Sequence, residues 1–60
     1  MIPQDPVMLL SFINMKLRDD YNGLEALAEG LDISSEELKT IVDKLKNLGY
    51  EYNPEHNKFI

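Results

Sequence analysis

The sequence predicts a mainly α domain, in which a three-helix bundle is followed by a short C-terminal β-hairpin. Apolar residues recur at helical spacing in three separate stretches. Capping residues or stop signals bound those stretches, and residues 50 to 60 alternate apolar and polar side chains around a turn cluster. At 60 residues, the chain has room for a single domain over residues 1–60.

The first helix is predicted over residues 6 to 19. Asp5 is a suitable N-cap, and Pro6 suits the first helical position because it has no N–H to pair. One stripe is expected to face the core, and it comprises Leu9, Leu10, Ile13 and Leu17. A second apolar stripe makes the helix apolar nearly all round, as in a helix that is buried or covered, and it comprises Met8, Phe12 and Met15.

The second helix is predicted over residues 23 to 30. We expect Asn22 to cap its start, with Glu25 completing a capping box. We expect Gly30 to end it, because glycine readily takes the left-handed conformation found after the last helical turn. The side expected to face inward holds Leu24, Leu27, Ala28 and Leu31.

The third helix is predicted over residues 35 to 48, and its start is the best-marked boundary in the chain. Ser34 as N-cap and Glu37 form the pattern of a capping box. Gly49 is a strong stop signal. The stripe expected to be buried comprises Leu38, Ile41, Val42, Leu45 and Leu48.

Residues 50 to 60 are predicted to form the hairpin. Tyr50 and Tyr52 alternate with polar residues, which is the period of a strand. In the turn, Pro54 suits the second position and Asn57 tolerates a positive φ. An isolated hairpin is marginal in water, so this one must lie on the helices. Its apolar side chains are the natural cover for the second stripe of the first helix.

The second and third predicted helices resemble a helix-turn-helix. In that motif a small residue, here Ala28, lets the two helices approach closely. The sequence departs from the motif at Asp32, where the turn usually has Gly, although Asp tolerates the left-handed conformation. With the hairpin added, the layout resembles a small winged helix. The positions that carry the resemblance are Leu27, Ala28, Leu31, Ile33, Leu38 and Ile41.

A closer resemblance covers nearly the whole chain. Its most characteristic segments are residues 1 to 12, residues 16 to 19 and residues 48 to 53. In these segments the chain resembles a family of short bacterial proteins catalogued as domain of unknown function 4250. That resemblance implies a free-standing bacterial cytoplasmic protein, and it supplies no catalytic residues.

The charge of the chain disfavours the DNA binding that a helix-turn-helix usually implies. Six Lys or Arg stand against eleven Asp or Glu, for a net charge of -5, whereas affinity for DNA depends largely on neutralising phosphates. The acidic balance also disfavours anionic membranes as partners. Weak or partner-assisted DNA binding stays open as the alternative function, through Ser35, Lys39, Thr40, Lys44 and Lys58.

The favoured function is a non-catalytic protein-interaction module. Methionine adapts to binding surfaces and phenylalanine is a common interface anchor, so the candidate interface is Met8, Phe12 and Met15. A homodimer is the first expected partner, because short chains often complete a core by dimerising. The competing interpretation is that the hairpin covers these three residues and they are ordinary core.

No pattern in the sequence indicates an enzyme, a cofactor or a metal site. The chain has no Cys, and its single histidine, His56, lacks a partner for nucleophilic catalysis or metal binding. A partial calcium-loop spacing near Asp20 places Arg18 at the first ligand position, where its cation repels calcium. So short a chain also leaves no room for an enclosed pocket of roughly 300 Å³, the usual size of a small-molecule site, and no substrate is implied. A small cleft between the first helix and the hairpin stays open as an alternative.

The N-terminal segment predicts a soluble cytoplasmic protein. Residues 1 to 6 carry no positive charge, and the apolar run over residues 7 to 10 is short. A secretory signal needs a basic start and a longer apolar core, and a membrane span needs a longer run still.

Overall fold

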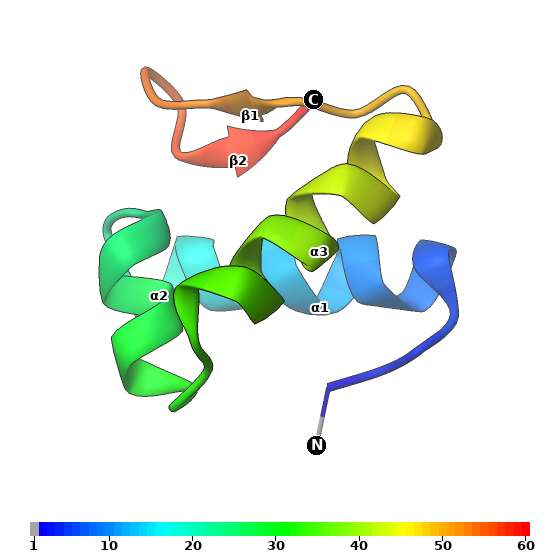
Figure 1. Ribbon diagram of the computed structural model, residues 1–60. Coiled ribbons are helices and arrows are strands. Elements are labelled where there is room, and N and C mark those ends of the chain that lie inside the picture. The colour runs from blue at the N-terminus through cyan, green and yellow to red at the C-terminus, as the bar shows by residue number, and fades with distance from the viewer. Residues whose placement is uncertain (1) are drawn as a thin grey trace.

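The computed structural model describes residues 2–60 of the chain. In chain order the elements are α1 (Pro6–Asp19), α2 (Leu24–Gly30), α3 (Ser35–Asn47), β1 (Tyr52–Asn53) and β2 (Lys58–Phe59). Figure 1 shows α3 crossing α1, with α2 at the C-terminal end of α1. The predicted mainly α architecture with a C-terminal hairpin is therefore confirmed, and its finer likeness to a winged helix stays a prediction.

The core forms where α1, α2, α3 and the hairpin meet. Its buried side chains come from every predicted inward stripe, and they are Leu9, Ile13, Leu17, Leu27, Ile41, Leu45 and Phe59. Half-buried apolar residues, among them Leu10 and Tyr52, pack around this cluster. Two members of the predicted inward stripes fall outside it. Ala28 is half-buried, and Leu48 lies one residue beyond the end of α3 and is exposed.

The start of α1 and both ends of α3 follow the predicted signals. The backbone N–H of Met8 donates to the Asp5 carboxylate at 3.4 Å, and the N–H of Glu37 donates to the Ser34 hydroxyl at 3.1 Å. The reciprocal bond from Ser34 N–H to Glu37 completes the capping box. Gly49 has a φ of 97°, so it ends α3 in the left-handed conformation that glycine tolerates best.

The ends of α2 differ from the prediction. Gly23 occupies the N-cap and no side chain caps it, so the predicted capping by Asn22 is wrong. Gly30 is helical, and its Cα lies against the Tyr21 ring, where a side chain would collide. The left-handed residue is Asp32, with a φ of 57°. Behind it the N–H of Ile33 bonds the Ala28 carbonyl, which is the pattern of a Schellman motif.

Replacing Asp32 with glycine should therefore stabilise the protein. Glycine removes the cost of a left-handed conformation, and the change also removes a negative charge from the C-terminal end of α2. We expect the free energy of unfolding to rise by about 0.5–1 kcal/mol. Urea unfolding followed by circular dichroism measures this, with Gly49→Ala as the opposite control, since it should lose about 1 kcal/mol. A loss of stability in Asp32→Gly would contradict the argument.

The two strands form a minimal antiparallel hairpin, with Tyr52 opposite Phe59 and Asn53 opposite Lys58. Beyond the strand ends, Glu51 and Ile60 exchange both backbone hydrogen bonds, at 3.1 and 2.9 Å. The turn closes through Asn57, which has a φ of 53° as its position in the sequence suggested. The hairpin packs on the helices mainly by contact between β2 and α1.

Candidate functional site

One side of α1 carries apolar side chains that nothing in residues 2–60 covers. Val7, Met8 and Met15 are 62%, 60% and 44% exposed, and Phe12 is half-buried between them and the core. With the neighbouring Pro3 and Ser11, these residues line an open hollow of about 350 Å³. We call these six residues the apolar face of α1, and none of them carries a charge.

The apolar face exists because the hairpin packs on a different side of α1. The prediction that hairpin side chains cover the second stripe is wrong for Met8 and Met15, which are exposed. β2 instead lies along the side of α1 that presents Asn14, and Phe59 enters the core there. All three candidate interface residues therefore lie on one surface, and only Phe12 also packs against the core.

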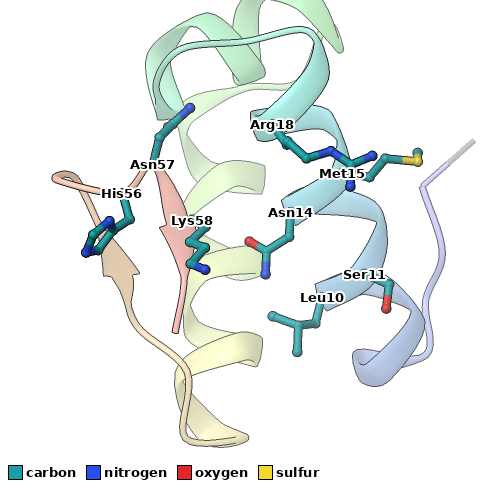
Figure 2. A pocket seen from close by; sticks show the side chains of 8 residues that line it. All are labelled: Leu10, Ser11, Asn14, Met15, Arg18, His56, Asn57 and Lys58. Carbon is teal, nitrogen blue, oxygen red and sulfur yellow. The ribbon is translucent and has the colours of Figure 1, made fainter.

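Asn14 sets the position of the hairpin. Its amide oxygen accepts the backbone N–H of Phe59 at 2.8 Å, and its amide nitrogen donates to the Phe59 carbonyl at 3.1 Å. Figure 2 shows this side chain pointing from α1 toward β2. The side chain thus pairs with the free edge of β2 as another strand would. Asn14 is half-buried and does not mark a solvent-exposed edge of α1.

Asn57 makes the second polar attachment. Its amide nitrogen donates to the carbonyls of Leu17 and Tyr21, at 2.9 and 3.0 Å, and its amide oxygen accepts the Tyr52 hydroxyl at 2.7 Å. The side chain therefore binds carbonyls at and just beyond the C-terminal end of α1, which α-helices leave unpaired. Sequence reasoning recognised the turn position of Asn57 but missed this role, because the partners are 36 and 40 residues away.

A second hollow, of about 770 Å³, lies between α1 and the hairpin (Figure 2). Arg18, His56 and Lys58 contribute basic groups to it, and it shares Ser11 and Met15 with the apolar face. Arg18 is already paired with Asp19, through two bonds of 2.8 and 2.9 Å. The His56 ring lies 4.0 Å from Glu55. The hollow is thus a polar groove whose cations are partly paired, and it contains no obvious anion cradle.

Charged side chains also border the apolar face. The Lys16 ammonium lies 5.8 Å from the centre of the Phe12 ring and 3.3 Å from Asp20. Hydrogen bonding to Arg18 holds the pKa of Asp19 below its usual value, and the same bond raises the pKa of Arg18. Both members of that pair are exposed, so we expect it to add little to stability.

The candidate DNA-contact residues fall on two different parts of the surface. Thr40 and Lys44 line a hollow of about 190 Å³ beneath the N-terminal segment, together with Ile2 and Pro3. Lys58 faces α1 across the polar groove. Ser35 and Lys39 are exposed on α3. The structure therefore places Lys58 beside α1, away from the α3 residues with which the helix-turn-helix hypothesis groups it.

No polar or charged side chain of residues 2–60 is fully buried. Within residues 2–60, no three acidic or histidine side chains gather closely enough to hold a metal ion. No helix in that part of the chain is long and apolar enough to cross a membrane. The groups with resolved pKa shifts, Arg18 and Asp19, are an exposed ion pair and are not enclosed in a cleft.

Comparison with known proteins identifies the family of the chain and nothing beyond it. Residues 3–59 match the family model described as a domain of unknown function, DUF4250. No curated protein and no solved structure matches the chain. The match covers every helix and strand described above and all six residues of the apolar face.

Proposed function

The chain belongs to the DUF4250 family, and we propose that it is a protein-interaction module that pairs with a second copy of itself through the apolar face of α1. The observation that carries this proposal is the exposure of Val7, Met8 and Met15 on a helix whose other sides are already occupied. A helix that is apolar nearly all round is covered in most soluble proteins. Here the hairpin leaves one side of α1 free.

The size and composition of the face support a second copy as the partner. A 60-residue chain has a small core, with seven buried apolar side chains among residues 2–60, and dimerisation is a common way to extend such a core. The hollow is lined without charge, so no ion is desolvated when two faces meet. Methionine side chains are flexible enough to fit the same residues of another copy.

The net charge of -5 works against pairing at long range but not at the contact itself. Two such chains repel each other, and salt screens that repulsion over about 10 Å at 0.1 M. We therefore expect self-association to be weak at low ionic strength and stronger as salt is added. A basic partner, drawn by the net negative charge of the chain, would show the reverse dependence.

Replacing Met15 with glutamate should abolish the association. The change places a charge inside the proposed interface, where it would be buried without a counter-ion. Sedimentation equilibrium or gel filtration with light scattering, from micromolar to millimolar chain, measures the effect. We expect at least a tenfold weaker self-affinity, with the monomer fold unchanged by circular dichroism.

Leu48→Glu is the matched control for this experiment. Leu48 is 41% exposed, close to the 44% of Met15, and lies outside the apolar face. It should leave the association unchanged. A wild-type chain that stays monomeric at millimolar concentration and high salt would overturn the proposal.

DNA binding has less support as a function. α3 carries Lys39, Lys44 and Lys46 against Glu36, Glu37 and Asp43, so its net charge is zero. Lys58 lines the polar groove beside α1, and Lys44 lines a different hollow. The proposed module is cytoplasmic, in keeping with the resemblance that first indicated the family.

A further inference from the structure

We infer that the two copies pair with their α1 helices antiparallel, so that Met8 of one copy packs against the partner's Met15 and Asp5 faces the partner's Lys16. This inference rests on the proposed function and specifies the geometry of the same surface. The apolar face is occupied by the α1 helix of a second copy, in the antiparallel orientation. The evidence for this orientation is the order of side chains along α1 and the charges that flank them.

The apolar face is nearly symmetric about its midpoint. Met8 and Met15 are seven residues apart, about two helical turns, and Ser11 and Phe12 stand midway between them. A two-fold axis through that midpoint reverses the second helix. It brings Met8 of each copy against Met15 of the other. Phe12 and Ser11 lie about 100° apart around the helix, so each meets the partner's copy of itself beside the axis. Closed dimers use self-complementary patches of this kind.

The charges at the edge of the face select the antiparallel orientation. Asp5 and Lys16 are eleven residues apart, which is three turns and about 20° around the helix, so they lie on the same flank. A two-fold axis perpendicular to the helices brings equal flanks together. Asp5 then meets the partner's Lys16, and this contact forms twice. A parallel pair has its two-fold axis along the helices and brings opposite flanks together, so Asp5 and Lys16 would lie away from the partner's charges and this contact would not form.

Contacts within the chain already hold Lys16 at this edge. Its ammonium lies over the Phe12 ring and bonds Asp20, and its side chain is only 30% exposed. The Asp5 carboxylate is exposed and makes one long hydrogen bond, of 3.4 Å to Met8 N–H, so it has acceptor capacity left. Antiparallel helices also place the positive end of one dipole beside the negative end of the other.

Cysteine cross-linking tests the register directly, because the chain has no cysteine of its own. The variant Met8→Cys is mixed with ¹⁵N-labelled Met15→Cys, and both are oxidised with oxidised glutathione. Mass spectrometry then separates the mixed disulfide from the two symmetric ones. We expect the mixed species to exceed the symmetric species several-fold, since a disulfide requires Cα atoms within about 7 Å. Leu48→Cys, outside the face, should cross-link only at the rate of random collision.

Charge reversal provides a second, independent readout. Asp5→Lys and Lys16→Glu should each weaken self-association by about three- to tenfold, because each sets like charges together. The double variant restores opposite charges across the two-fold axis, so its self-affinity should return toward that of the wild type. Asp5→Lys also removes the N-cap of α1, and the double variant does not replace that cap. Recovery therefore reports the interface and not the fold of the monomer.

The two proposals fail in distinguishable ways. In one outcome, the chain associates and Met15→Glu abolishes the association, but the disulfides formed are mainly the symmetric ones of Met8→Cys. The helices would then pair in parallel, and this result overturns the orientation alone. Association without recovery in the double charge variant overturns the Asp5–Lys16 contact. Absence of any association overturns the proposed function and the orientation together.

Discussion

Replacing Leu45 with alanine should leave much of the protein unfolded at 25 °C. Leu45 is fully buried at the centre of the core, between α3 and the side chains of α1 and the hairpin. Truncating a buried leucine costs about 2–5 kcal/mol, because apolar contacts are lost and a cavity is left behind. A domain of this length has a total stability of only about 3–9 kcal/mol. The loss is therefore comparable to the whole stability of the fold.

Leu48→Ala is the matched control for Leu45→Ala. Both leucines belong to the predicted buried stripe of α3, but Leu48 is 41% exposed. Urea unfolding followed by circular dichroism, at chain concentrations below self-association, should show less than about 1 kcal/mol of change in Leu48→Ala. Equal losses in the two variants would mean that the core does not centre on Leu45.

Replacing Asn57 with alanine should detach the hairpin from α1. The change removes three hydrogen bonds, to Leu17, Tyr21 and Tyr52, and leaves part-buried carbonyls unpaired. It also places alanine at a φ of 53°. We expect a loss of about 2–4 kcal/mol in the free energy of unfolding.

The variant Asn57→Gly separates the two contributions. Glycine keeps the positive φ at little cost but makes none of the side-chain bonds. It should be about 1 kcal/mol more stable than Asn57→Ala while remaining less stable than the wild type. Amide hydrogen exchange at Glu51 and Ile60, which bond each other across the hairpin, measures its detachment. Wild-type protection of these amides in Asn57→Ala would contradict the attachment.

These attachments explain why the proposed interface is available. α1 uses one side for the core, through Leu9, Ile13 and Leu17, and a second side for the hairpin, through Asn14. Because two asparagines anchor the hairpin with directional bonds, it cannot slide round to cover the remaining side. The apolar face is thus a consequence of how the hairpin is held.

Local signals in the sequence were sufficient for most of the helix boundaries. The capping residues Asp5 and Ser34 and the stop at Gly49 act within a few residues of themselves, and the structure confirms all three. The same local reasoning failed for α2. Gly30 is the last helical residue and leaves room for the Tyr21 ring, and Asp32 takes the left-handed position instead.

The candidate interface was partly predictable for a related reason. The spacing of Met8, Phe12 and Met15 marks a second apolar stripe, which is a property of the helix alone. Whether that stripe is covered depends on where the hairpin docks. The sequence offered no signal for this, because Asn14 and Asn57 are ordinary polar residues until their distant backbone partners are known.

The sequence by itself determined the element order, the inward stripes, the acidic charge and the family, because each depends on composition or on contacts between near neighbours in the chain. The tertiary structure alone decided which side of α1 the hairpin occupies. It also decided that Lys58 lies beside α1 and that Leu48 is exposed. The placement of the hairpin and of Lys58 depends on hydrogen bonds between residues 40 and 45 positions apart, and no local pattern encodes which distant backbone groups a side-chain amide will meet.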